Sequence, residues 1–361
     1  MTYRPEPPFE LPPEHRPESR LRETGLRIQA RALARAEARA RSDAASGTPV
    51  SARPPRLGDL AELVRAPAAL TVVGDSLAGL AAARAGTPTP FRSRHLLLPV
   101  ASACLYLGGM ALNDYADRDV DAVERPERPV PSGRVTPGTA LAVGAALTAG
   151  GVAAAGVAGG RRALGVAIPL AACVWTYDLA AKDRSAGPFV MAACRGLDVL
   201  LGATPGRLRS ALPAAAGLSA HTLGVTLLSR GEVHGTTARV AGGVAAGTVA
   251  GAVAAATARP WHAATALSAR RTAVRWTTVG AATAYAAACL PAQARAAASP
   301  TAANARAATR SGIQAMVPLQ AAWAARSGSL GTTAVLAGIA AIGYGLRLLG
   351  RTRGSAGVSI T

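Results

Sequence analysis

The residues best suited to chemistry lie in one stretch, NDYADRDVDAVERPERPVPSGRV, which runs from position 113 to 135. If a helix continues through its first part, four oxygen-bearing side chains fall within about 100° of one another on one face, at roughly 100° per residue. They are Asn113, Asp114, Asp117 and Asp121. Carboxylates held this close repel one another unless a cation neutralises them, and hard oxygen ligands suit Mg²⁺. The spacing therefore predicts a magnesium site.

Three arginines, Arg125, Arg128 and Arg134, follow the acidic residues in a proline-rich segment. Guanidinium groups bind phosphate oxygens in a bidentate manner, so acids followed by arginines indicate a phosphate ester bridged by a metal ion. The alternative is a helix cap followed by a solvated run of charges. Such a run would not require acids aligned at i, i+4 and i+8, whereas Asp119 falls on the opposite face.

These residues also carry a resemblance to a known family. Asn113-Asp114, Asp117 and Asp121 match the NDxxDxxxD motif of the UbiA-type membrane prenyltransferases, and ERPERPVPSGRV (124 to 135) resembles that superfamily's continuation into a cytoplasmic loop. Three further stretches resemble the EboC-like actinobacterial branch: TYDLAAKDRSAGPFVMAACRGLDVLLG (176 to 202), LLSRGEVHG (227 to 235) and MVPLQAA (316 to 322). The resemblance covers roughly residues 57 to 350. It implies a polyprenyl diphosphate substrate.

A tyrosine and a lysine, Tyr177 and Lys182, follow the fourth apolar run. The resemblance implies that Lys182 binds the diphosphate and that Tyr177 lines the pocket. The alternative is an aromatic residue and a snorkelling lysine at an ordinary membrane boundary.

Two charged residues, Arg195 and Asp198, lie three positions apart inside an apolar run. Charges in lipid are costly and must face a partner or a cavity, so these two are candidates for substrate binding. A self-contained i, i+3 ion pair is an equal alternative. Asp75 and His221 are lone polar residues of other apolar runs, for which a cavity and a structural hydrogen bond are both open.

The segment Ser229 to Gly235 lies where the superfamily carries a second acidic motif, which the resemblance associates with a second Mg²⁺. This sequence departs from that motif, because Glu232 is its one acid. Arg230 and His234 are candidate diphosphate donors, and Glu232 is a candidate metal ligand. Either the second metal is held more loosely, or Arg230 replaces part of its charge, or catalysis is weaker or different.

The composition is that of a membrane protein crossed by several helices. Half of the residues are hydrophobic, 16% are charged, and alanine and glycine dominate the long apolar runs. We expect tightly packed helices with small residues at their contacts. The net charge is +19, and the arginines lie in an amino-terminal arm and at the ends of apolar runs, so anionic lipid and diphosphate are favoured over nucleic acid. The four cysteines lie in apolar runs without CxxC spacing, so we expect free thiols and no disulfides.

The apolar runs predict an all-α bundle of about nine transmembrane helices. These lie at 67–83, 95–113, 139–158, 163–179, 187–203, 211–229, 238–257, 272–291 and 331–349. A tenth apolar segment, 311–326, is short and polar enough to favour an interfacial or re-entrant helix over a span. Residues 57–65 predict a short interfacial helix.

Three regions are expected: a basic arm, mostly disordered, at 1–56, with a helix near 19–41; a membrane domain at 57–350; and a disordered tail at 351–361. The arm carries eleven arginines, which places it in the cytoplasm of a protein of the cell membrane. The loops after the second, fourth, sixth and eighth spans then share the cytoplasmic face, and these loops carry the candidate site residues outside the membrane.

Together the residues and the resemblance predict a Mg²⁺-dependent membrane prenyltransferase. It would transfer a prenyl group from a polyprenyl diphosphate to an acceptor whose identity, like the chain length, the sequence does not define. The rival hypothesis is a non-catalytic membrane protein that binds or moves a lipid or small metabolite. The altered segment around Glu232 favours the rival, and the intact acids and arginines of the first motif favour the enzyme.

Overall fold

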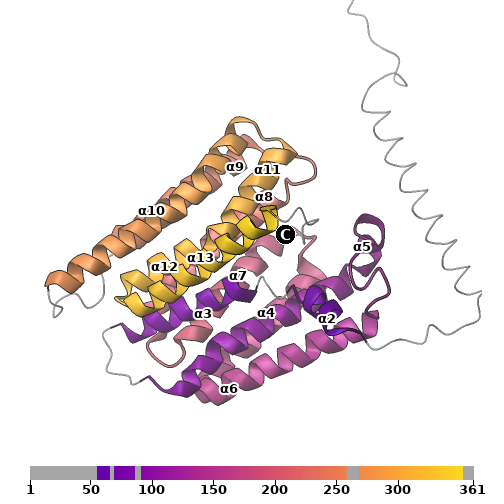
Figure 1. Ribbon diagram of the computed structural model, residues 1–361, viewed down its shortest axis with the longest axis horizontal. Helices are drawn as coiled ribbons and strands as arrows, with labels where there is room; N and C mark the ends of the chain where they lie inside the picture. Colours follow the sequence, from indigo (N-terminus) through magenta and orange to yellow (C-terminus); the bar gives the residue numbers. More distant parts are fainter. Residues whose placement is uncertain (1–54, 66–68, 86–90, 258–267, 353–361) are drawn as a thin grey trace, which may run out of the picture.

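The computed structural model describes residues 55–65, 69–85, 91–257 and 268–352, which fold into helices with no strand among them (Figure 1). The predicted all-α class is confirmed. The helices are α2 (Leu57–Leu63), α3 (Ala69–Arg84), α4 (Leu97–Ala116), α5 (Arg118–Glu124), α6 (Pro137–Thr176), α7 (Gly187–Ala203), α8 (Leu208–Ser229), α9 (Ala238–Thr257), α10 (Ser268–Ala298), α11 (Ala302–Gln314), α12 (Met316–Arg326) and α13 (Leu330–Thr352). The predicted helix at 19–41, and nearly all of the arm and tail, lie outside the described residues.

Every predicted span coincides with a helix. Among the described residues, four helical segments are long and apolar enough to cross a membrane: Ser93–Ala116, Pro137–Ala181, Leu208–Ser229 and Ala238–Thr257. The number nine stays a prediction, because length and composition alone do not place the other helices in lipid.

The long helix α6 is a hairpin of two antiparallel arms. Gly160 interrupts it with φ 60° and ψ −146°, a conformation that glycine adopts without strain. The indole Nε1 of Trp175 donates a 3.2 Å hydrogen bond to Thr148 Oγ1, although the two residues are 27 positions apart. In a straight helix they would be about 40 Å apart. The chain therefore reverses at Gly160, as the separate predicted spans 139–158 and 163–179 require.

The short apolar segment 311–326 contains a helix, α12, that lies in the interior of the bundle. Its 11 residues reach about 16 Å, too short to span a membrane. Nine of them are buried, and α12 packs against α3, α10 and α13. The interfacial alternative is therefore wrong, because an interfacial helix would expose one face, while the re-entrant alternative stays a prediction.

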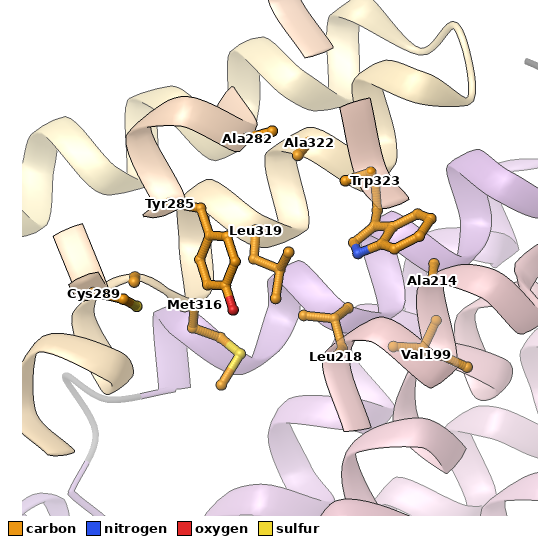
Figure 2. Close-up of a cluster of buried hydrophobic side chains, with 13 residues drawn as sticks. Val199, Ala214, Leu218, Ala282, Tyr285, Cys289, Met316, Leu319, Ala322 and Trp323 are labelled. Carbon is orange, nitrogen blue, oxygen red and sulfur yellow. The ribbon is translucent and has the colours of Figure 1, made fainter. Parts of the chain in front are cut away.

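Helices α8, α10 and α12 meet in a core cluster of apolar side chains. Leu218 of α8, Tyr285 of α10 and Leu319 of α12 are each at most 1% exposed and belong to it (Figure 2). His221 lies beside it. Its Nδ1 lies 2.9 Å from the Tyr285 hydroxyl and its Nε2 lies 3.0 Å from the Gly312 carbonyl oxygen. Since that carbonyl can only accept, Nε2 carries the proton, and His221 has a structural hydrogen bond.

Helices α3 and α7 approach each other closely because each presents glycine to the other. A Cβ atom at Gly79 would lie 1.8 Å from the Val199 carbonyl oxygen, and one at Gly202 would lie 1.9 Å from the Ser76 carbonyl oxygen. Any larger residue would force these helices apart. This contact confirms the expected role of small residues at helix contacts.

The loops predicted to share one face of the membrane do lie together. Arg230, after α8, donates to the Arg184 carbonyl in the loop before α7. The Thr236 amide donates to the Pro300 carbonyl between α10 and α11, at 3.0 Å. Helices α2 and α5 lie at the same end of the bundle, on the right of Figure 1. The candidate residues of three separate loops, those after α4, α6 and α8, are thereby brought to one end.

Candidate active site

The acidic motif, Asn113 to Asp121, covers the end of α4 and the first part of α5. Helix α4 ends at Ala116, and its C-cap Asp117 has φ −90° and ψ 2°, outside the helical region. The expectation of one uninterrupted helix through the motif is therefore wrong. The Asp117 amide still donates to the Asn113 carbonyl at 2.9 Å, and the Asp121 amide to the Asp117 carbonyl at 2.8 Å. These bonds preserve the i, i+4 spacing of the motif across the break.

Two of the acids, Asp114 and Asp121, are buried and share one arginine. Nη1 of Arg128 lies 3.4 Å from Asp114 Oδ1 and 2.5 Å from Asp121 Oδ2. The two carboxylate side chains are 3% and 5% exposed. Asp114 also receives Nη2 of Arg65 at 3.0 Å. Ionised carboxylates are buried only when they are paired, and these pairs provide the compensation.

The third acid, Asp117, is paired with Lys182 across the bundle. The Lys182 ammonium donates to Asp117 Oδ1, and both side chains are partly buried. Lys182 follows a π-helical turn, Tyr177–Ala181, at the end of the second arm of α6. Such turns are frequent at functional sites, because they rotate the following side chains out of α-helical register. The structure thus brings Lys182 to the acidic motif, 65 positions away in sequence.

A fourth acid joins the motif from the π-helical turn. Asp178 is 4% exposed, and its Oδ1 accepts a 3.3 Å hydrogen bond from Nδ2 of Asn113. Tyr177 is half-buried beside it. Asn113, predicted on the acidic face, therefore contacts an acid that the sequence analysis had not included in the site.

The three arginines that follow the motif have different surroundings. Arg128 contacts the acids, as described above. Arg125 is exposed. Arg134 donates to Asp59 and Glu62 of α2, each at 2.7 Å from Nη1. The three therefore do not form one phosphate-binding group in this structure, because the turn at 129–135 directs Arg134 toward α2.

The segment after α8 is held by backbone carbonyl groups. The Arg230 guanidinium donates to the carbonyl oxygens of Arg184 and Lys182, and Arg306 donates to the carbonyl oxygen of Glu232. The Glu232 side chain is half-buried, and His234 is exposed. Arg230 thus ties this segment to the Lys182 loop, while a role of Glu232 and His234 in binding stays a prediction.

The charged residues inside α7 do not pair with each other. Arg195 forms its ion pair with Asp75 of α3, and Nε2 of Gln320 in α12 donates to the other Asp75 oxygen at 2.8 Å. Asp198 accepts a 2.7 Å hydrogen bond from Ser102 of α4. The self-contained i, i+3 pair is therefore wrong, because the close contact of α3 with α7 offers Arg195 a better partner. Asp75 also has a structural partner.

One part of this polar network lies away from the acidic motif. Ser102, the partner of Asp198, and Asp114 are twelve residues apart on α4, which corresponds to about 18 Å along the helix. Asp198 is therefore too distant to touch a phosphate bound at the motif. A role of Arg195 and Asp198 in binding another part of a substrate stays a prediction.

The donor chemistry of the motif fits Mg²⁺, whereas the observed side-chain arrangement is that of ion pairs. The oxygen ligands are those of Asp114, Asp117, Asp121 and Asp178, and hard oxygen donors suit this cation. In Asp114, Asp117 and Asp121, one carboxylate oxygen forms all of the ion pairs. The other oxygen of each carboxylate could bind a metal. Within the described part of the chain, no three His, Cys, Asp or Glu side chains are gathered closely enough to hold a metal as they stand.

Two residues of the site were missed by sequence reasoning. Arg65 was expected only as the end of a short interfacial helix, and its contact with Asp114 joins positions 49 apart. Asp178 carried a detectable signal, since an acid next to Tyr177 in an apolar run needs a polar partner. No comparable signal marks Arg65.

Comparison with known proteins gives one family. The model of the UbiA prenyltransferase family matches residues 72–309, well over half of the chain. The chain is 58% identical over 45 residues to a digeranylgeranylglyceryl phosphate synthase of Methanopyrus kandleri, a stretch that covers 12% of this chain and 17% of that protein. The match therefore spans less than a fifth of the length of that relative.

Two solved structures have a similar fold. One is of a digeranylgeranylglyceryl phosphate synthase in membranes, with a TM-score of 0.55 and 16% identity over 75% of this chain and 98% of the other. The second is the apo structure of a UbiA homolog from Aeropyrum pernix K1, with a TM-score of 0.54 and 20% identity over 70% of this chain and 96% of the other. At these identities the similarity concerns the fold.

Proposed function

Because the chain belongs to the UbiA prenyltransferase family, we propose that it is a membrane prenyltransferase that transfers a prenyl group from a polyprenyl diphosphate to an acceptor. One observation carries this proposal. Asp114, Asp117 and Asp121 lie with three cationic side chains, Arg65, Arg128 and Lys182, at one end of a helical membrane bundle. Acids and bases gathered in this way suit a metal-bound diphosphate whose apolar tail lies in the membrane.

The residues of the chain have separable roles in this reaction. Asp114, Asp117 and Asp121 would hold Mg²⁺, with Asp178 as a fourth oxygen donor nearby. When bound there, Mg²⁺ supplies positive charge to the diphosphate and so makes it a better leaving group. Lys182 and Arg128 add fixed positive charge at the same place. Charges that are already in position stabilise a developing negative charge without reorganisation.

The reaction breaks the bond between the allylic carbon and the diphosphate oxygen, and the bonding electrons leave with the diphosphate. The acceptor then donates an electron pair to the allylic cation and loses a proton. The core between α4, α6 and α7 is lined by apolar side chains. A cation formed beside such a core would be shielded from water and so from hydrolysis. The acceptor and the length of the prenyl chain are left open by this argument.

Three finer points belong to the same proposal. The stretches at 176–202, 227–235 and 316–322 support a place in the EboC-like branch. Binding of the diphosphate by Arg125, Arg230 and His234, and the lining of the pocket by Tyr177, are supported by the position of these residues at the same end of the bundle. The arginine-rich arm supports a cytoplasmic location for that end.

The test is the release of inorganic pyrophosphate from prenyl diphosphates by the purified protein in detergent or nanodiscs. We expect release that requires Mg²⁺, stops when EDTA removes the metal, and resumes when Mg²⁺ is restored. In the rival hypothesis of a non-catalytic membrane protein, the ion pairs of these acids would be structural only. Absence of release across prenyl diphosphates of several chain lengths, by protein that is folded, would support that rival.

A further inference from the structure

The segment that joins α2 to the bundle contains a strained arginine. Arg65 has φ 48°, and it is the non-glycine residue with positive φ among those that the structure describes. Glycine or asparagine is the usual choice for a left-handed residue just after a helix, because other side chains are strained there. Strain of this kind is maintained where the surroundings fix the conformation, and it is common at functional sites.

The strained backbone directs the Arg65 side chain into the acidic motif. Its Nη2 lies 3.0 Å from Asp114 Oδ1, and its Nη1 lies 3.3 Å from Met110 Sδ. An arginine has five N–H donors, and contacts with the described residues engage these two nitrogens. The Arg65 side chain is 26% exposed, compared with 14% for Arg128. Arg65 is therefore the more open of the two arginines on Asp114, with donors left for a further oxygen ligand.

Helix α2, which carries Arg65, is fastened to the turn after the motif by Arg134. Nη1 of Arg134 donates to Asp59 Oδ1 and Glu62 Oε2, each at 2.7 Å, and Nη2 donates to Glu62 Oε1 at 3.0 Å. The hydrogen bond from Arg134 holds the pKa of Asp59 below its usual range. Leu63 adds an apolar contact, since it is fully buried against Val130 and Val135.

We propose that Arg65 binds the diphosphate at this site, and that Arg134 is the positioning residue that holds α2, and with it Arg65, against the acidic motif. The inference rests on the proposed function and adds a diphosphate ligand from outside the motif. It also gives Arg134 a role other than direct phosphate binding. A guanidinium that shares Asp114 with Arg128 can turn its remaining donors to phosphate oxygens without leaving a buried carboxylate unpaired.

The competing explanation is that Arg65 is only a counter-ion for Asp114. Under that explanation its loss would lower stability and leave diphosphate binding unaffected. However, Arg128 already contacts Asp114. A purely structural partner for Asp114 would not require an arginine on a left-handed backbone, because a lysine or glutamine on an unstrained backbone could fill that role. Stability and binding must therefore be measured separately.

The experiment is calorimetric binding of inorganic pyrophosphate with Mg²⁺ to the purified full-length protein, with thermal unfolding of the same samples. We expect Arg65→Gln to weaken binding by about tenfold or more, since a charge-assisted contact is lost. Arg65→Gly removes the same group and relieves the left-handed strain, so it should weaken binding equally without lowering the unfolding temperature. Arg161→Gln, an exposed arginine at the Gly160 turn, is the matched control and should bind like the parent.

Arg134 is tested through its dependence on Arg65. Arg134→Gln should weaken binding several-fold, and Arg134→Lys should recover most of it. The double variant Arg65→Gln, Arg134→Gln should bind no more weakly than Arg65→Gln alone, because residues that act through one another are not additive. Additive losses would overturn the positioning role.

The failure of this inference can be told apart from failure of the proposed function. A parent that binds pyrophosphate, together with an Arg65→Gly variant that binds within about twofold of it, would overturn the inference and leave the function intact. A folded parent that neither binds pyrophosphate nor releases it from prenyl diphosphates would overturn both.

Discussion

The ammonium group of Lys182 donates a hydrogen bond to the carboxylate of Asp117, the residue at which α4 ends. This contact joins the first motif to the π-helical turn at the end of α6. Asp117 is a candidate metal ligand, and Lys182 is the residue that the family resemblance associates with binding of the diphosphate. The contact brings the two side chains together.

Lys182 and Asp117 should behave as a coupled pair. Lys182→Met and Asp117→Asn each remove one charge, and the double variant should lose less than the sum of the single losses. We expect a coupling energy of about 1 kcal/mol or more from initial rates of pyrophosphate release, within the range found for residues in contact. Losses that add within about 0.5 kcal/mol would show that the contact is not maintained during turnover.

Asp117→Asn should lower the rate of pyrophosphate release by about a hundredfold, close to 3 kcal/mol in the barrier. The substitution keeps the shape of the side chain and removes the charge proposed to hold the metal. Asp119→Asn is the internal control, because the Asp119 side chain is 85% exposed and, among the described residues, its ion pair is with the neighbouring Arg118. It should cost well under about 1 kcal/mol. Equal, parental rates for both variants at matched protein amounts would contradict the metal site.

Glu232→Gln tests whether the segment after α8 contributes to metal binding. A carboxylate ligand that loses its charge should raise the Mg²⁺ concentration needed for half-maximal activity. In the structure Arg306 contacts the Glu232 carbonyl oxygen, which the substitution preserves. Glu124→Gln, at the exposed end of α5, serves as a comparison. If the Mg²⁺ titration does not change, Glu232 has a structural role only.

The buried pair of Asp75 and Arg195 should be important for stability. Asp75→Asn leaves the Arg195 charge uncompensated in the bundle and should destabilise the fold by about 3–5 kcal/mol. The double variant Asp75→Asn, Arg195→Met removes both charges and should recover at least half of that loss. The midpoint of unfolding in mixed micelles measures both. A double variant as unstable as the single one would mean that Arg195 contributes more through packing than through its charge.

The orientation in the membrane can be tested with cysteines on a background in which the four native ones are alanine. Ser132 lies at the acidic-motif end and Arg209 at the opposite end, and both are exposed. These positions avoid Gly133, which has φ 77°, and Gly206, where a Cβ would lie 2.4 Å from the Ala83 carbonyl oxygen. In intact cells, Arg209→Cys should react with an impermeant thiol reagent and Ser132→Cys should not. The reverse pattern would invert the topology.

The sequence was informative where structure depends on local pattern. Apolar runs predicted the helices, and the motif spacing predicted that Asp114 and Asp121 share an environment, which their common partner Arg128 bears out. The turn at Gly160 could be placed because Arg161 and Arg162 interrupt the apolar run there.

Partners that are distant in sequence could not be predicted. Arg195 pairs with Asp75, 120 positions away, because glycine contacts bring α3 against α7. Arg65, whose backbone is left-handed, reaches Asp114 across 49 positions. Neither the helix contact nor the left-handed backbone has a periodic signature. From spacing, a pair with Asp198 was therefore an open alternative for Arg195, and phosphate binding was the expectation for Arg134.

The pairing of Asp114, Asp117 and Asp121 with cations of their own chain has a consequence for biogenesis. Proteins whose acidic or thiolate ligands have no internal counter-ion depend on their metal to fold. Here Arg65, Arg128 and Lys182 pair with the acids in the folded chain. Assembly of the helices therefore does not need a metal ion to offset the burial of these acids.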